Sequence, residues 1–517
     1  MNPDTLNPLD FIFAPHLADF YKPGHMSQHV EGTEEIYCNF TARGATHAQV
    51  LDDFDGKTVW FGLQGKMMFL HAIWHQTFFS KPKAEVLGRF QRRMDYSIGP
   101  GAVSTKRLSA LHDLGFLPIH VKQLPEGSRV NLRVPTCTVR STRGKATAFI
   151  APYIESQLSS ELWKTPTNAT TAHEFRRMLT RFCEMTGGDP NFIRWQGHSF
   201  AFRGMSGIFD ATMECGHSLC FTGTDNISNL DYLEWAYMAD ASMEMLGGSV
   251  PADEHGVVSM HCSDVKGEID YVRNLITNVY PRGIVSHVSD TTDFWWMMTE
   301  GLRQLKPTIM ARQPDMFGLA KYVSRPDSGD PELIVMGDPK ADQGTPEHKG
   351  ALRCILEVFD EATTKTHRTQ TGHWMFDPHA GLIYGDAITL LRGNNINQRM
   401  FDEGFCSSNV VYGIGSFSYQ YVSRDTYNHA YKATNAIING EHRPMFKAPK
   451  TGDGMKTSLR GYIRVEKEGN DFVAYDMQTP EQEKKGELRD AYFEGKFPNM
   501  ERLMTIRERL VPDFYKL

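Results

Sequence analysis

The sequence predicts an α/β protein with two parts, an irregular β/α barrel in the middle of the chain and an α+β domain built from both chain ends. Between residues 195 and 420, short apolar runs repeatedly end in a polar residue beside a turn, and helix-like segments separate several of them. The flanks mix strand-like and helix-like pieces without this rhythm. With 517 residues, 40% of them hydrophobic, the chain can bury more than one core.

Residues 1–170 are expected to form the N-terminal part of the α+β domain. Runs with strand character occupy 35–40 and 128–134, whereas the apolar spacing over 59–75 predicts a helix. His71 and His75 lie four apart on that helix, a spacing that suits a metal, but no third ligand follows. A surface or packing role is therefore expected for this histidine pair.

Residues 171–420 are expected to form the barrel. Six short runs end beside a turn, at 198–204, 218–225, 284–290, 322–327, 382–386 and 410–415. In a parallel β/α barrel, functional side chains lie at the C-terminal ends of the strands. The run ends would therefore bring together Arg203, Asp225, Asp290, Arg325, Asp327 and Asp386. By contrast, the aromatic segment 293–296 is expected to be helix core.

Residues 421–517 are expected to return to the α+β domain, with a strand over 458–465. Two segments rich in Pro, Gly, Asp and Lys, at 338–350 and 447–456, predict solvent-exposed loops. No internal repeat or low-complexity tract interrupts this plan.

Composition excludes several classes of function. The formal net charge of −7 argues against a broad nucleic-acid surface, which needs clustered Lys and Arg. The sequence contains neither an apolar run of about 18 residues nor a basic leader, so neither a membrane span nor secretion is predicted. The eight cysteines contain no CxxC pair, so neither a zinc site nor a disulfide framework is indicated. A reducing cytoplasm is the expected location, and an anionic ligand would need a local basic pocket.

The run ends carry two kinds of side chain that suit one class of ligand. Three carboxylates suit a divalent metal, a diol or both: Asp290, Asp327 and Asp386. Three arginines suit phosphate oxygens, which a guanidinium binds in bidentate fashion: Arg203, Arg325 and Arg424. The turn at 413–416 adds glycine amides that can approach an anion closely. A sugar phosphate satisfies both sets of groups.

Several motifs follow one another in a specific order between about residues 19 and 465. They are DFYK at 19–22, FGLQ at 61–64, Phe200 with Arg203-Gly204, GTD at 223–225, SVPADEH at 249–255, Ser286 with Ser289-Asp290, RPDSG at 325–329 and Gly385-Asp386. In this order they resemble the nicotinamide phosphoribosyltransferases, a family of type II phosphoribosyltransferases. SVPAxEH and RPDSG are the most specific part of the resemblance.

The resemblance implies a glycosyltransferase that makes nicotinamide mononucleotide and diphosphate from nicotinamide and 5-phosphoribosyl 1-diphosphate, in NAD salvage. It also implies Mg2+, a homodimer with shared active sites, and stimulation by ATP through a phosphohistidine. Two alternatives stay open. A nicotinate phosphoribosyltransferase would need a cationic or neutral contact where Asp225 lies, and a catalytically silent nucleotide-binding protein would not need the full set of ring, ribose and phosphate groups.

The resemblance also implies residue roles at the nicotinamide ring. Phe200 would stack on one face of the ring, and Tyr21 of the other protomer on the opposite face. Asp225 would accept the carboxamide N–H and disfavour nicotinate by charge repulsion. Ser286 would meet the amide oxygen.

Further residues are implied for the sugar, the phosphates and the coupling to ATP. Asp327 and Asp386, the latter after Gly385, would bind the ribose, with Arg325 between ring and phosphates. The phosphates would be held by Arg203, Arg424, Lys432, Gly415 and Ser416. His255 would accept a phosphoryl group from ATP, and Asp290 would help to hold Mg2+, mainly through the diphosphate. Four residues are thereby tied most directly to catalysis: His255, Asp225, Arg325 and Asp327.

Some positions depart from the family pattern. The glycine run after one strand is shorter here, at 413–417, and Ala430 and Ala448 replace a serine and an aspartate of the family. A near copy of RPDSG occurs at 311–315, but only 325–329 completes the motif. These departures bear on phosphate affinity and ATP coupling more than on the ring pocket.

Overall fold

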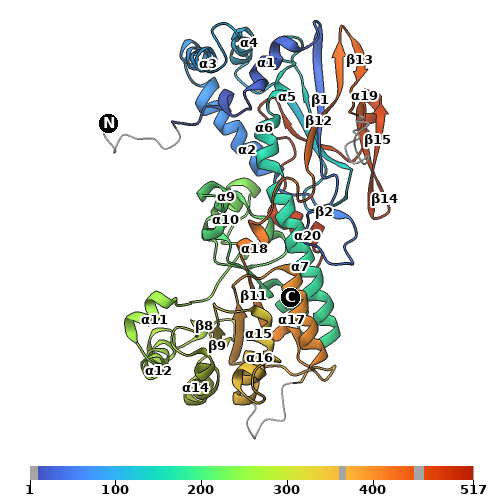
Figure 1. Ribbon diagram of the computed structural model, residues 1–517. Helices are drawn as coiled ribbons and strands as arrows, with labels where there is room; N and C mark the ends of the chain where they lie inside the picture. Colours follow the sequence, from blue (N-terminus) through green and yellow to red (C-terminus); the bar gives the residue numbers. More distant parts are fainter. Residues whose placement is uncertain (1–9, 360–367, 448–458, 516–517) are drawn as a thin grey trace, which may run out of the picture.

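Two six-stranded sheets organise the chain, one in the upper and one in the lower half of the molecule in Figure 1. The computed structural model describes residues 10–359, 368–447 and 459–515. Each sheet has its own hydrophobic core, and the long helix α7 (Lys164–Thr186) runs from the upper half down along the lower one. The mixture of strands and helices agrees with the α/β class predicted from the sequence.

The upper sheet is antiparallel and draws its strands from both chain ends. Its order is β13 (Glu441–Pro444), β12 (Ala430–Ile438), β1 (Thr33–Thr41), β5 (Pro135–Ser141), β3 (Ile119–Gln123) and β16 (Arg489–Phe493). Two small ribbons accompany it, β2 (Lys57–Val59) with β4 (Arg129–Asn131), and β14 (Tyr462–Glu468) with β15 (Asp471–Gln478). β1 lies between β12 and β5, so the first and last parts of the chain share one sheet.

The lower sheet is parallel throughout and holds the strand ends predicted to carry function. Its order is β7 (Gly223–Thr224), β6 (Gly197–Ser199), β11 (Val410–Ile414), β10 (Ala380–Tyr384), β9 (Ala320–Arg325) and β8 (Gly283–Val288). The register aligns neighbouring C-terminal ends, for example Val288 with Arg325. Parallel pairing brings the ends of all six strands to one side of the sheet.

An extended segment at 248–253 joins the two edges of this sheet. The Gly248 amide donates to Thr222 O, and the Thr224 amide donates to Gly248 O, both at 2.9 Å, beside β7. Further along, the Ser286 amide on β8 donates to Pro251 O at 2.9 Å, and Ala252 forms a parallel bridge with Ser286. Backbone bonds on both sides of this closing segment, 248–253, therefore complete the ring.

Helices cover the two sheets and connect their strands. Their bounds are α1 (Tyr21–Gln28), α2 (Leu63–Trp74), α3 (Lys83–Ser97), α4 (Lys106–Leu114), α5 (Ile150–Tyr153), α6 (Glu155–Leu162), α8 (Ile193–Gln196), α9 (Ile208–Met213), α10 (Ile227–Tyr237), α11 (His255–His261), α12 (Val265–Asn274), α13 (Phe294–Trp296), α14 (Leu302–Met310), α15 (Pro331–Met336), α16 (Pro346–Phe359), α17 (Leu390–Asp402), α18 (Ser416–Tyr419), α19 (Pro480–Glu483) and α20 (Leu503–Leu510). None of the described helices combines the length and apolar character that crossing a bilayer requires.

Several element boundaries differ from the sequence prediction. The helix expected over 59–75 begins later, at Leu63, because β2 ends at Val59 and Gly62, with a φ of 110°, precedes α2. The run at 218–225 contributes only a two-residue strand, and the loop expected at 338–350 ends where α16 begins, at Pro346. The predicted loop at 447–456 lies, apart from Lys447, outside the described residues.

The C-terminal helix packs on the barrel side rather than under the upper sheet. Leu503, Ile506 and Leu510 of α20 belong to the barrel core, and the fully buried Arg507 donates to the carbonyls of Ser218 and Leu246. The predicted domain boundaries stay a prediction, but the last part of the chain contributes to both cores.

Candidate active site

Residues predicted to bind substrate lie at the C-terminal ends of the parallel strands. Phe200 follows β6, Asp225 follows β7, Asp290 follows β8, Arg325 ends β9, Asp386 follows β10 and Ser416 follows β11. Ser286 lies within β8, and His255 begins α11 directly after the closing segment. One mouth of the ring therefore gathers most of the set, as the strand-end rule predicted.

Two glycines make room for the aromatic ring of Phe200. A Cβ atom at Gly385 would lie 2.2 Å from Phe200 Cε2, and one at Gly413 would lie 2.3 Å from Phe200 Cδ2. Real Cβ atoms do not come so close, so the ring lies against the bare backbone of β11 and the turn after β10. Gly385, predicted to bind substrate, thus has a packing role beneath the predicted stacking residue.

Asp225 is held by His198 and by Ser249, the first residue of the SVPADEH motif; the sequence predicted no individual role for either. Its Oδ1 lies 2.8 Å from His198 Nε2 and accepts a hydrogen bond of 2.6 Å from Ser249 Oγ. Burial opposes ionisation of Asp225, but the bonds and charge from His198, the Ser249 bond and the charge of Arg325 hold its pKa below the ordinary value. The mouth of the ring therefore presents an ionised carboxylate beside Phe200.

The RPDSG segment is fixed against β8 through Asp290. Asp290 Oδ2 accepts from the Asp327 amide at 3.0 Å and from Ser328 Oγ at 2.6 Å. Arg325 donates from its guanidinium to the carbonyl of Asp253 in the closing segment. Burial raises the pKa of Asp327, Arg325 counteracts this rise, and Asp290 adds to it. Arg325 and Asp327 therefore lie next to each other in one electrostatic environment.

His255 faces two carboxylates across the start of α11. Its Nδ1 lies 2.9 Å from Thr291 Oγ1, and its Nε2 lies 3.5 Å from Asp290 Oδ1 and 3.9 Å from Asp327 Oδ2. The imidazole is about half exposed, with 48% of its side chain accessible. A phosphoryl donor could approach it from the mouth of the ring.

The predicted phosphate end lies where the turn at 202–204 meets α18. A Cβ atom at Gly204 would lie 2.6 Å from Ser416 Cβ, so these two segments touch closely. Lys164 of α7 bonds to Asp210 and to Gln420, and Gln420 donates to Ser206 Oγ at 2.5 Å. These bonds hold the loop of Arg203 against the glycine turn that carries Gly415 and Ser416.

Three predicted residues do not belong to the ring. Tyr21 begins α1 in the upper half, Lys432 lies on β12, and Arg424 lies just before that strand. All three are exposed. Partial desolvation nevertheless lowers the pKa of Lys432; the charges of Arg43, Lys447 and Arg424 lower it further, and Glu155 counteracts them. The upper half therefore carries its own cationic cluster, consisting of Arg43, Arg424, Lys432 and Lys447.

Three buried polar atoms at the ring mouth lack a hydrogen-bond partner within the described residues. They are Ser286 Oγ, Arg325 Nε and Asp290 Oδ1, and the nearest charged group to the last is His255 Nε2, at 3.5 Å. No group of three or more His, Cys, Asp or Glu side chains in the described ranges is arranged to hold a metal. The open Asp290 oxygen fits a cation that takes most of its ligands from a bound diphosphate.

Other sequence candidates have packing roles. Arg312, in the near copy of RPDSG, donates to the carbonyls of Ile276, Tyr280 and Gly283, so its guanidinium caps backbone groups. His71 and His75 stack with ring centroids 6.4 Å apart. Trp296 is partly buried and packs against the barrel core, which agrees in part with the core position expected for 293–296.

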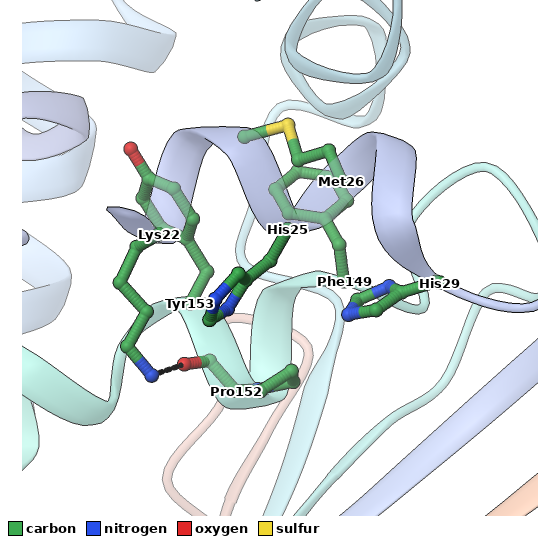
Figure 2. A pocket seen from close by; sticks show the side chains of 7 residues that line it. All are labelled: Lys22, His25, Met26, His29, Phe149, Pro152 and Tyr153. Carbon is green, nitrogen blue, oxygen red and sulfur yellow. Dashed lines mark hydrogen bonds between the residues drawn. The ribbon is translucent and has the colours of Figure 1, made fainter. Parts of the chain in front are cut away.

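A small hollow lies apart from the ring mouth. Figure 2 shows it between α1 and α5, with Lys22 Nζ donating to Pro152 O at 2.9 Å. Its lining residues are Lys22, His25, Met26, His29, Phe149, Pro152 and Tyr153. Because none of these seven belongs to the strand-end set, the hollow is not the predicted substrate site.

Comparison with known proteins gives the class of protein that the sequence motifs resemble. The model of the nicotinate phosphoribosyltransferase (NAPRTase) family matches residues 195–494. A nicotinamide phosphoribosyltransferase of Acinetobacter baylyi is 46% identical over 507 residues, which cover 98% of this chain and 97% of that protein.

Two solved structures share the fold at low sequence identity. Nicotinate-nucleotide pyrophosphorylase from Pyrococcus furiosus matches with a TM-score of 0.56 and 13% identity, covering 99% of this chain and 98% of that one. Human nicotinic acid phosphoribosyltransferase matches with a TM-score of 0.51 and 12% identity, covering 96% and 92%.

The parallel ring beside a second, antiparallel sheet is thus the fold that these two structures share with this chain, the fold of type II phosphoribosyltransferases. The predicted fold class is thereby confirmed. The chain belongs to the nicotinate phosphoribosyltransferase (NAPRTase) family.

Proposed function

We propose that the chain transfers the phosphoribosyl group of 5-phosphoribosyl 1-diphosphate to nicotinamide, releasing nicotinamide mononucleotide and diphosphate. The observation that carries this choice is Asp225, an ionised carboxylate next to Phe200 at the ring mouth. A carboxylate accepts the N–H of a carboxamide, whereas it repels the carboxylate of nicotinate. The 46% identity to a nicotinamide phosphoribosyltransferase supports the same choice.

The reaction needs no nucleophile from the protein. The pyridine nitrogen forms a bond to the anomeric carbon while the bond from that carbon to the diphosphate oxygen breaks. Positive charge develops on the ribose and negative charge on the leaving group. Asp327 and Asp386 would bind the ribose hydroxyls and tolerate the cationic sugar, while Arg325 and Arg203 neutralise the diphosphate. Catalysis then rests on positioning and electrostatics.

Magnesium is proposed as the counter-ion of the diphosphate. Asp290 would hold it through Oδ1, which accepts no hydrogen bond among the described residues. The cation would supply charge neutralisation of the leaving group.

A homodimer with shared active sites is proposed from the division of the predicted residues. Tyr21, Arg424 and Lys432 lie on the α+β half, whereas Phe200 and Asp327 lie on the ring. A two-fold arrangement would set the α+β half of one protomer over the ring of its partner, twice in each dimer. Tyr21 of the partner would then cover the face of nicotinamide opposite Phe200.

Coupling to ATP is proposed at His255. Its imidazole is accessible and lies at the same mouth as Asp290 and Asp327, where diphosphate and magnesium would bind. A neutral imidazole can accept the γ-phosphoryl group of ATP, with ADP as the leaving group. The added negative charge would strengthen binding of the magnesium-bound substrate. A cytoplasmic location is also proposed, since all eight cysteines are free thiols.

One assay separates this proposal from its alternatives. Purified protein is incubated with 5-phosphoribosyl 1-diphosphate, Mg2+ and nicotinamide, nicotinate or quinolinate in turn, and the mononucleotide is identified by mass. We expect nicotinamide mononucleotide as the main product. Nicotinate mononucleotide in its place would identify a nicotinate phosphoribosyltransferase, and no product from any of the three would favour a catalytically silent nucleotide-binding protein.

A further inference from the structure

We infer that His198 is a specificity-determining residue that acts through Asp225: together with Ser249 it occupies one oxygen of the Asp225 carboxylate and leaves the other to the pyridine substituent. The inference rests on the proposed function, because it concerns how the same site distinguishes an amide from an acid.

The hydrogen bonds around Asp225 are unevenly distributed. His198 Nε2 and Ser249 Oγ both bond to Oδ1, at 2.8 Å and 2.6 Å, and they lie 3.4 Å from each other. Within the described residues, Oδ2 receives no such bond. Since 48% of the Asp225 side chain is accessible, the second oxygen can meet a ligand at the ring mouth.

The position of His198 is determined by the strands around it. His198 is 8% exposed and lies on β6, next to β7, which ends before Asp225. A Cβ atom at Gly223 would lie 2.8 Å from His198 Nδ1. The imidazole therefore fits only because the first residue of the GTD motif has no side chain. The ring also meets Phe200 edge-on, with centroids 5.4 Å apart. His198 therefore contacts both the stacking residue and the carboxylate.

A second buried histidine supports β7 from the other side. His217 Nε2 lies 2.9 Å from Gly223 O, and its Nδ1 lies 2.7 Å from Tyr419 OH. The short strand that precedes Asp225 is thus held on both sides. The Asp225 carboxylate can therefore neither shift toward a bound ligand nor rotate without losing its hydrogen bonds to His198 and Ser249.

This arrangement explains how one carboxylate can select an amide. The N–H of nicotinamide would donate to Oδ2, while the donors on Oδ1 keep Asp225 ionised and fixed. Nicotinate would bring a second negative charge to the same oxygen. Without the His198 donor, the carboxylate could rotate away or take up a proton and donate to nicotinate, so the penalty on the acid would fall.

The test is a double-mutant cycle between His198 and Asp225, with the ratio of kcat/KM for nicotinamide to that for nicotinate as the readout. His198→Leu should lower the ratio by about tenfold or more, as expected for loss of a hydrogen bond to a charged group. On the Asp225→Asn background, the same change should leave the ratio almost unaltered. His198→Gln, which keeps an N–H donor, should restore most of the preference.

Two further variants keep the outcome decisive. Ser249→Ala removes the other donor from an exposed side chain, and it should lower the ratio even if His198→Leu does not fold. His75→Leu, at the exposed residue that follows α2, is the matched control and should keep the wild-type ratio. Unchanged ratios for both His198→Leu and Ser249→Ala, or additive effects in the double variant, would overturn the inference.

Failure of the proposed function gives a different result. In that case the wild-type protein makes no nicotinamide mononucleotide, or Asp225→Asn leaves the ratio unchanged. If Asp225→Asn lowers the ratio and the His198 and Ser249 variants do not, the proposed function stands and only the role of His198 is wrong.

Discussion

At the scale of single residues, the ring mouth depends on atoms that are missing as much as on atoms that are present. Phe200 fits against the backbone of Gly385 and Gly413 because neither carries a Cβ atom. A side chain there would displace the aromatic plane from the position in which it is proposed to stack. The glycines of the family motif can therefore affect substrate binding without touching the substrate.

Gly385→Ala should weaken nicotinamide binding. The new methyl group would overlap Phe200 Cε2, and relieving such overpacking costs about 1–3 kcal/mol. We expect the KM for nicotinamide to rise by roughly tenfold or more, with a smaller change in the KM for 5-phosphoribosyl 1-diphosphate. Gly88→Ala is the control, because a Cβ atom there meets nothing within 4 Å. Equal KM values for the two variants would contradict the packing argument.

Asp225→Asn should relax the selection of amide over acid. The change removes the negative charge and leaves a group of nearly the same shape, so repulsion of nicotinate disappears. The preference for nicotinamide, measured as a ratio of kcat/KM values, should fall by about tenfold or more. An unchanged ratio in a folded variant would show that Asp225 does not meet the pyridine substituent.

His255→Ala should separate coupling from transfer. The imidazole lies near Asp290 and Asp327 but makes no bond to the reacting carbon in the proposed mechanism. We expect the variant to form nicotinamide mononucleotide without ATP, yet to show neither ATP stimulation nor an acid-labile phosphoenzyme. Labelling wild-type protein with γ-labelled ATP and mapping the peptide tests the role directly. If the peptide containing His255 carries no label, the phosphohistidine is excluded, whereas the transferase assignment is unaffected.

At the scale of elements, the closing segment is held by a buried charge network behind it. Asp253 Oδ2 lies 2.6 Å from His287 Nδ1, and His287 Nε2 lies 3.0 Å from Glu268 Oε1. Burial opposes the charged form of His287, but the bonds and charges of Asp253 and Glu268 raise its pKa above the ordinary value. His287, between two carboxylates, thus ties the closing segment to β8 and α12.

This network predicts a pH dependence of stability. A histidine whose pKa is raised on folding stabilises fully below its unfolded pKa of about 6.5, and the stabilisation is lost as pH rises through the folded value. The melting temperature should therefore decline more steeply with pH for wild-type protein than for His287→Gln, which should be less stable at low pH. Thermal melts between about pH 6 and pH 9 measure both. Parallel curves would mean that His287 is not charged in the fold.

The sequence predicts those parts of the fold and the site that depend on local patterns, but not those that depend on contacts between residues far apart in the chain. Arg203, Asp225, Asp290 and Arg325 could be grouped because parallel strands align their ends, a rule that needs only local patterns. The contact between His198 and Asp225 could not be predicted in this way, because 27 positions separate the two residues and nothing local distinguishes that histidine from a core residue. The closing segment was missed as a ring element because it pairs only at its two ends.

At the scale of the whole molecule, the predicted site residues fall on two surfaces. Phe200, Asp225 and Asp327 belong to the ring, whereas Tyr21 and the cationic cluster belong to the half built from both chain ends. Figure 1 shows α1 and β12 in the upper half and β8, β9 and β11 in the lower half. A second protomer is the proposed means of uniting the two surfaces.

Subunit exchange tests this arrangement. Tyr21→Ala and Asp327→Ala should each be nearly inactive, because each removes one wall of every shared site. A mixed dimer would contain one intact site, so random exchange of equal amounts should recover about a quarter of wild-type specific activity. Tagged subunits verify the exchange. If mixed dimers form and activity stays at the level of the single variants, Tyr21 acts within its own protomer or has no role.

The closing segment also limits how the chain can vary in length. Gly248 is bridged to Gly223 and Ala252 to Ser286, so two fixed points lie four residues apart, a span of about 13 Å in extended chain. An inserted or deleted residue between them would break one bridge or turn the following side chains to the opposite face. Ser249 lies within this stretch and His255 lies three residues after it. The spacing between the amide-selecting end and the phosphoryl-accepting end is therefore set by a number of residues that can be substituted but not added or removed.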